Sequence, residues 1–116
     1  MDERATQQPM TRDPAAPLDV APLRAAAAEA TSLLRVLANE DRLLLLCQMT
    51  DGEKSVGELE ALLDIRQPTL SQQLGVLRTE GLVATRREGK RIFYSVSDPK
   101  ALTLLGVLYG LYCPKD

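Results

Sequence analysis

The sequence of 116 residues predicts a mainly α-helical fold with one small β-hairpin, on three observations. Apolar residues recur at helical spacing through most of the chain after about residue 20. Two runs rich in β-branched and aromatic residues, 82–87 and 91–96, flank Glu88-Gly89-Lys90, which predicts a hairpin. The length is that of one ordinary domain. We therefore expect five helices and a hairpin around a single core.

The first two helices follow a proline-containing start. Residues 1–20 combine three prolines with polar and small residues, so we expect a flexible tail there and the folded domain at 21–116. From Pro22 an alanine-rich run with helical spacing of its apolar residues predicts the first helix. Asn39 is placed to cap a second helix, which is apolar nearly all round, as in a buried helix, and which Asp51-Gly52 closes.

The next two helices are separated by a tight turn. Ser55 and Glu58 match a capping box, which opens a third helix that ends near Leu63. Pro68 suits the first position of a fourth helix, because proline lacks an N–H that this position leaves unbonded anyway. Gly81 then provides the exit from this helix.

The last helix starts at Asp98, follows the hairpin and runs to Cys113. A short helix, a tight turn, a second helix with polar outward residues and a basic hairpin make up a winged helix-turn-helix, which is a DNA-reading arrangement.

The first and fifth helices carry more apolar surface than so small a core covers, so a homodimer is expected. Its two-fold symmetry would place two reading helices about 34 Å apart on an inverted repeat of double-stranded DNA.

Composition excludes several classes of function. The chain has no histidine, so it forms no Ser-His-Asp triad, imidazole base or mixed Cys/His zinc site, and we do not expect an enzyme. No apolar run approaches the roughly 18 residues that spanning a bilayer requires, and the start lacks the features of a secretory signal. We expect a cytoplasmic protein that does not bind membranes and has no permanent structural disulfide.

Positive charge is concentrated in residues 66–91. This segment holds six basic and two acidic residues, a net charge of +4, in a chain whose formal net charge is −2. The candidate DNA-binding residues are Gln67, Thr69, Ser71, Gln72, Gln73, Arg78, Arg86, Arg87, Lys90 and Arg91. Gln72 and Gln73 are the main candidates for base edges, and the hairpin cations for phosphates. A merely solvated polar helix face is the alternative, which the basic hairpin disfavours.

Three segments carry a family resemblance. "LANEDRLLLLCQM", "LSQQLGVLRTEGLV" and "REGKRIFYSV" resemble the ArsR-type family of bacterial winged-helix repressors, over roughly residues 25–113. The family pattern of the reading helix is matched by Ser71, Gln72, Leu74, Leu77, Arg78, Gly81, Leu82 and Val83. The resemblance implies a homodimeric DNA-binding repressor with five helices and a wing.

Many members of this family sense metals, and the residues for that branch are missing. The resemblance would require an Asp-x-His pattern in the fifth helix, where this chain has Asp98 and no histidine, and cysteines in the third helix, which has none. We therefore expect no metal and no cofactor. Two thiolates alone suit arsenite or zinc poorly, but a dimer that pools four thiols keeps a thiophilic metal or metalloid sensor as an alternative.

The two cysteines, Cys47 in the second helix and Cys113 at the end of the fifth, resemble the persulfide-responsive branch, the biofilm growth-associated and sulfide-oxidation repressors. The resemblance implies that reactive sulfur species or oxidants bridge the two thiols and that the operator is then released. Gly106, Gly110 and Cys113 form a strip of small residues, which predicts a close approach by another segment. The alternatives are that both cysteines are apolar core filler or belong to a thiol-dependent redox enzyme.

Overall fold

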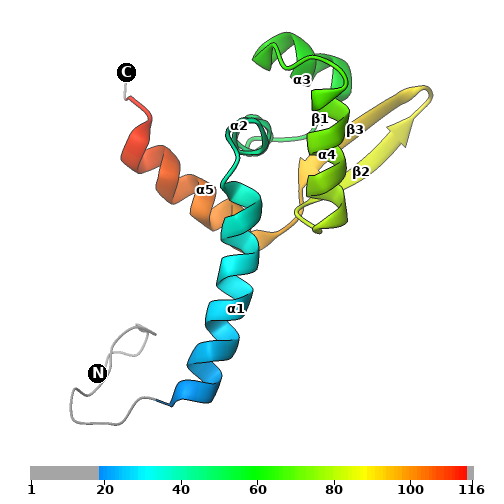
Figure 1. Ribbon diagram of the computed structural model, residues 1–116. Helices are drawn as coiled ribbons and strands as arrows, with labels where there is room; N and C mark the ends of the chain where they lie inside the picture. Colours follow the sequence, from blue (N-terminus) through cyan, green and yellow to red (C-terminus); the bar gives the residue numbers. More distant parts are fainter. Residues whose placement is uncertain (1–18, 115–116) are drawn as a thin grey trace. The chain divides into compact units, whose positions relative to one another are not determined.

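The computed structural model describes residues 19–114, which form five helices and three strands (Figure 1). The elements are α1 (Val20–Leu37), α2 (Glu40–Gln48), β1 (Lys54–Ser55), α3 (Val56–Leu63), α4 (Thr69–Thr79), β2 (Val83–Glu88), β3 (Arg91–Val96) and α5 (Pro99–Tyr112). The mainly helical winged helix-turn-helix is confirmed. The predicted flexible tail falls almost entirely on residues 1–18, outside the described part of the chain.

The chain divides into two compact units at Thr31 and Ser32, and every candidate site residue lies in the second, residues 32–116. The single domain at 21–116 stays a prediction. Of the helices in residues 19–114, none is both long and apolar enough to cross a membrane.

Local capping signals set the starts of α2 and α3 as expected. The Asn39 side chain accepts a hydrogen bond from the backbone N–H of Arg42 at 3.0 Å, which satisfies one of the unbonded donors at a helix start. In α3, the N–H of Glu58 donates to Oγ of Ser55 and the N–H of Ser55 donates to the Glu58 carboxylate. The capping box predicted from the sequence is therefore present.

Helix α4 starts one residue later than the sequence suggested. Pro68 is the residue before the helix rather than its first residue. The side chain of Gln67 accepts a hydrogen bond from the N–H of Ser71 at 3.1 Å, which provides the cap that Pro68 lacks. The start of the reading helix is thus fixed by a residue predicted to contact DNA.

The sheet has the strand order β1-β3-β2 and is antiparallel throughout. Strands β2 and β3 form the expected hairpin, with Val83 opposite Val96 at one end and Glu88 opposite Arg91 at the turn. Gly89 in this turn has a φ of 62°, a left-handed conformation that glycine adopts without strain. Strand β1 is only two residues long, and its residues carry no strand signal in the sequence.

The core is built mainly from leucines of the helices. Its members are Val36, Leu37, Leu45, Leu46, Met49, Leu59, Ile65, Leu70, Leu74, Leu77, Leu82, Val83, Ala101 and Leu105. Burial of α2 is less complete than its apolar sequence predicted, because Leu44 remains 40% exposed. One side of α2 therefore packs in the core while another is open to solvent.

Helix α5 leaves much of its apolar surface open. Val107, Tyr109, Leu111 and Tyr112 are each more than half exposed. A Cβ added at Gly106 or Gly110 would meet no atom within 4 Å, so within the described residues the predicted close approach is absent. Gly106 and Cys113 instead line an open pocket beside α2, which leaves room at this strip, so an approach by a second subunit stays a prediction.

Candidate DNA interface and thiol pocket

The reading helix α4 has one buried face and one exposed polar face. Leu70, Leu74 and Leu77 lie in the core with at most 2% of their surface exposed. Ser71 and Gln72 lie on the exposed side of the N-terminal half, which is the part of a recognition helix that meets base edges. The leucine stripe therefore fixes which side of α4 is available to a ligand.

The remaining polar candidates on and next to α4 differ in their surroundings. Thr69 is partly buried at the helix start, and Gln67 is exposed with its side chain engaged in the cap. Arg78 is exposed in the last turn, where positive charge suits the helix dipole. Gln73 is partly buried, and its Oε1 accepts a hydrogen bond from Nη1 of Arg42 at 2.9 Å. The two adjacent glutamines are thus in unlike environments, with only Gln72 exposed.

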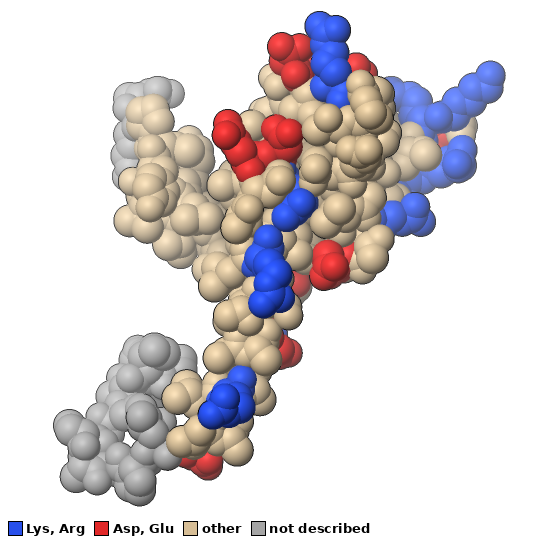
Figure 2. Space-filling view, viewed as in Figure 1, with Lys and Arg blue, Asp and Glu red and all other residues tan. Residues whose placement is uncertain are grey.

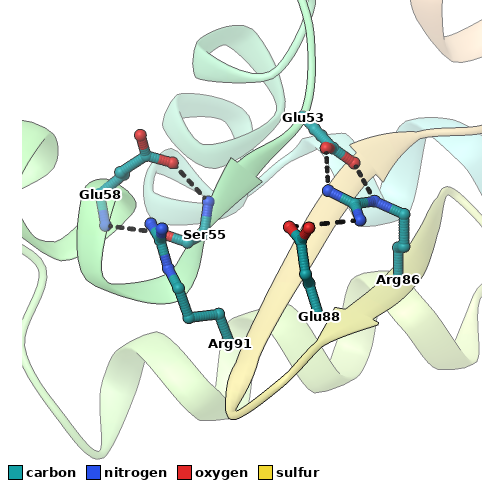
Figure 3. A network of polar contacts seen from close by, with 6 residues as sticks. All are labelled: Glu53, Ser55, Glu58, Arg86, Glu88 and Arg91. Atoms are coloured by element: carbon teal, nitrogen blue, oxygen red, sulfur yellow. Dashed lines mark hydrogen bonds and ion pairs between the residues drawn. The ribbon is translucent and has the colours of Figure 1, made fainter.

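The first arginine of the wing, Arg86, is engaged within the protein (Figure 3). Its Nε and Nη2 donate to the two carboxylate oxygens of Glu53 at 3.1 and 2.5 Å, and its Nη1 lies 3.6 Å from Glu88. The hydrogen bonds from Arg86 hold the pKa of Glu53 below its ordinary value. Most of the Arg86 charge is therefore balanced locally, and the residue ties β2 to the segment before β1.

Arg91 is engaged in a similar way at the start of β3. Its Nη2 donates to Oγ of Ser55 at 3.2 Å, which links the wing to the capping box of α3 (Figure 3). The guanidinium carbons of Arg86 and Arg91 lie 4.7 and 4.9 Å from the ring centre of Phe93, which is within range of a cation–π contact. Both arginines thus help to hold the hairpin on the helical body.

Arg87 and Lys90 have a different environment. Both are exposed, and among the described residues neither makes an ion pair or a side-chain hydrogen bond with another residue. The turn between β2 and β3 projects beyond α3 and α4 in Figure 1, and Lys and Arg side chains gather over this projecting part in Figure 2. Two cations at the wing are therefore available to phosphates.

Cys47 and Cys113 line one pocket of about 650 Å³ between α2 and α5. Cys47 is partly buried in α2, and Cys113 is exposed directly after the last residue of α5. Both are free thiols. Leu63, Leu105 and Tyr109 form much of the apolar wall of this pocket. The two cysteines of the chain, 66 positions apart in sequence, are thus brought to one place.

The environment of Cys47 makes its thiolate harder to form. Partial burial raises the pKa of Cys47 above its ordinary value, and negative charge on Cys113 raises it further. Because the thiolate is the nucleophile, alkylation of Cys47 by iodoacetamide should be slower at neutral pH than alkylation of cysteine in a short peptide. In the variant Cys113→Ser, burial is the one remaining cause of the raised pKa. Its alkylation rate should reach half its maximum at a higher pH than the rate of the peptide. A half-maximal rate at a lower pH than in the peptide would contradict this.

Known proteins resemble the chain in both sequence and fold. The family model described as "Bacterial regulatory protein, arsR family" matches residues 39–85. The biofilm growth-associated repressor of Agrobacterium fabrum is 54% identical over 105 residues, which cover 86% of this chain and 90% of that protein. The crystal structure of the transcriptional repressor BigR from Xylella fastidiosa superposes with a TM-score of 0.77 at 46% identity, covering 84% of this chain and all of that one.

The chain belongs to the ArsR family of bacterial regulatory proteins.

As an ArsR-family winged helix-turn-helix protein, it is a DNA-binding transcriptional regulator and not an enzyme. The transcriptional activator HlyU of Vibrio cholerae is also related, 42% identical over 98 residues that cover 84% of this chain and 91% of that protein. The family resemblance read from the sequence is therefore confirmed.

Three residues of the site were not predicted from the sequence. Arg42, Glu53 and Phe93 each hold a predicted DNA-binding side chain in place, but two of the contacts span 31 and 33 positions. No local pattern identifies such partners. The only signal is the position of Arg42 near the cap of a helix, which by itself predicts no contact with α4.

Proposed function

We propose that this ArsR-family regulator is a repressor that binds an inverted-repeat operator as a homodimer and releases it when reactive sulfur species or oxidants bridge Cys47 and Cys113. The observation that carries the proposal is that the two thiols of the chain line one pocket between α2 and α5. A bridge there would join two helices that are far apart in sequence. One of them, α2, is packed against the reading helix α4.

The surface of α4 and the wing supports the DNA-binding part. Gln72 and Ser71 are exposed on the reading helix, and Arg87 and Lys90 are exposed on the hairpin. Hydrogen-bonding side chains on a helix that fits the major groove read base edges, whereas cations beside it contact phosphates. Arg86 and Arg91 are assigned to holding the wing in place, because their guanidinium groups already have partners.

The open apolar face of α5 supports the homodimer. Leu111 and Tyr112 are 71% and 80% exposed, and Val107 is 53% exposed, which is a large apolar surface for one helix. A second copy related by a two-fold axis would cover it with the same surface, and it would place two reading helices on an inverted repeat.

Repression rather than activation is proposed because the more similar relative is a repressor. The Agrobacterium fabrum protein has 54% identity, whereas the activator HlyU has 42%. Under this assignment, release of the operator would switch transcription on.

The thiol chemistry proceeds in two balanced steps with a persulfide, R–S–SH. The exposed Cys113 attacks the outer sulfur, forms Cys113–S–SH and releases the thiol R–SH. Cys47 then attacks the inner sulfur of Cys113, which forms a disulfide and releases hydrogen sulfide. Two thiols are oxidised and the persulfide is reduced. Exposure favours Cys113 for the first step, since the pKa of Cys47 is raised by burial.

The experiment uses the reduced full chain and DNA fragments that this protein selects from a pool of random DNA sequences. The reduced protein should retard an inverted-repeat fragment, and added polysulfide should release it. Intact-mass analysis should then show one bridged chain that has lost two hydrogens or gained sulfur atoms. Retardation that polysulfide leaves unchanged would contradict the proposal.

The same experiment tests the metal-sensing alternative. Residues 19–114 contain no group of three or more His, Cys, Asp or Glu side chains placed to hold a metal ion, so a metal would need thiols from two subunits. Release by zinc or arsenite, without polysulfide and without a change in covalent mass, would favour that alternative.

A further inference from the structure

Arg42 of α2 contacts two other helices within residues 32–116. Its Nε donates to the carbonyl of Val36 at 2.7 Å and its Nη2 to that of Arg35 at 3.3 Å, both in the last turn of α1. Its Nη1 donates to Oε1 of Gln73 in α4 at 2.9 Å. One guanidinium therefore joins α1, α2 and α4.

These contacts follow from the chemistry of helix ends and of arginine. The last four carbonyls of a helix lack partners within the helix, and they carry partial negative charge. A guanidinium has five donors in a rigid planar fork, so it bonds two carbonyls of α1 and still has a donor that points in a fixed direction. Among the described residues, no carboxylate forms an ion pair with Arg42. The donor that reaches Gln73 is thus not drawn away by a competing charge.

We propose that Arg42 is a positioning residue for DNA reading, which acts by holding Gln73 and through it the rotation of α4 about its axis. The inference rests on the proposed reading of base edges by α4. Successive residues of a helix are about 100° apart around its axis. A helix held by Gln73 on its inner side therefore presents its neighbour Gln72 outward, as the exposure of the two side chains indicates.

Two adjacent and chemically identical side chains, Gln72 and Gln73, have different roles under this proposal. Gln72 would bond a base edge, whereas Gln73 would bond Arg42 and contact no base. A longer-range role follows for α2, because Arg42 lies five residues before Cys47 on the same helix. Any displacement of α2 by a thiol bridge would reach α4 through this contact as well as through the leucine core.

The test measures the ratio of the Kd for random DNA to the Kd for a selected operator, at one salt concentration and with the reduced full chain. Gln72→Ala should lower this ratio about 5- to 150-fold, the effect of removing one side chain that bonds a base edge. Arg42→Met and Gln73→Ala should each lower it at least fivefold while the Kd for random DNA stays within twofold. The double variant Arg42→Met/Gln73→Ala should be no worse than the poorer single variant, because both remove the same hydrogen bond.

Gln73→Glu is the matched control. A carboxylate still accepts from Arg42, so a positioning role predicts that the operator preference is retained. Direct reading by Gln73 predicts instead a changed base preference, since glutamine pairs with adenine and glutamate with cytosine. A changed preference, or single variants whose ratios equal that of the wild type, would overturn the inference.

A variant that fails to fold and a wild-type protein that does not discriminate between DNA sequences give different results in this test. If Arg42→Met fails to fold, which circular dichroism would show, Gln73→Ala and Gln73→Glu still decide the matter because Gln73 is at the edge of the core. If the wild-type protein itself shows a ratio near one, the proposed function fails. If the wild type discriminates and the Gln73 variants do so equally, only the role of Arg42 fails.

Discussion

Cys47→Ser and Cys113→Ser are each expected to bind operator DNA as the wild type does and to stay bound when polysulfide is added. Serine is close to cysteine in size, so the partly buried and exposed sites should accept it, but it forms no sulfur bridge. For the wild type, a coupling of 1–3 kcal/mol between bridge and DNA would weaken operator affinity about 5- to 150-fold. Affinities measured before and after treatment check both statements.

Either single variant has the same diagnostic value, because a bridge needs both thiols. The double variant should behave like the singles, with no additional loss of response. Cys47→Ala controls for packing, because it removes the sulfur without introducing a hydroxyl into a half-buried site. Should Cys47→Ser or Cys113→Ser still release DNA on treatment, the paired-thiol switch is wrong.

Arg87→Gln/Lys90→Gln is expected to weaken binding to all DNA sequences alike and to reduce its dependence on salt. Each phosphate bound by a cation releases condensed counterions, so the slope of log K against log salt concentration should fall in magnitude by about 0.9 for each phosphate that is no longer bound. Two such phosphates therefore predict a change of about 1.8. The ratio of operator to random affinity should stay constant, since phosphates carry no sequence information.

Arg86→Gln is the matched control for the wing, because it removes the same charge from the adjacent residue. Glu53 and Glu88 already balance the Arg86 charge, so its loss should change the salt slope less than Arg87→Gln does. The variant should instead loosen the hairpin, which faster amide hydrogen exchange in β2 and β3 would reveal. Equal changes in slope for Arg86→Gln and Arg87→Gln would mean that both arginines contact phosphates.

The sequence alone determined the elements whose causes are local. The caps at Asn39 and at Ser55 with Glu58 act within three residues, so their side chains and acceptors appear together in the sequence. The leucine stripe of α4 and the turn at Gly89 depend on periodicity and on one residue's conformational freedom. These signals suffice for a winged helix-turn-helix, and they fail for β1, whose two residues pair only because β3 lies beside them.

Tertiary structure decided which candidate side chains are available to DNA. Gln72 and Gln73 are identical in the sequence, as are Arg86 and Arg87, and a sequence pattern ranks neither pair. The distinction comes from partners 31 and 33 positions away, Arg42 for Gln73 and Glu53 for Arg86, which packing alone brings into reach. The same holds for Cys47 and Cys113, because only the fold brings these two side chains, 66 positions apart in sequence, to one pocket.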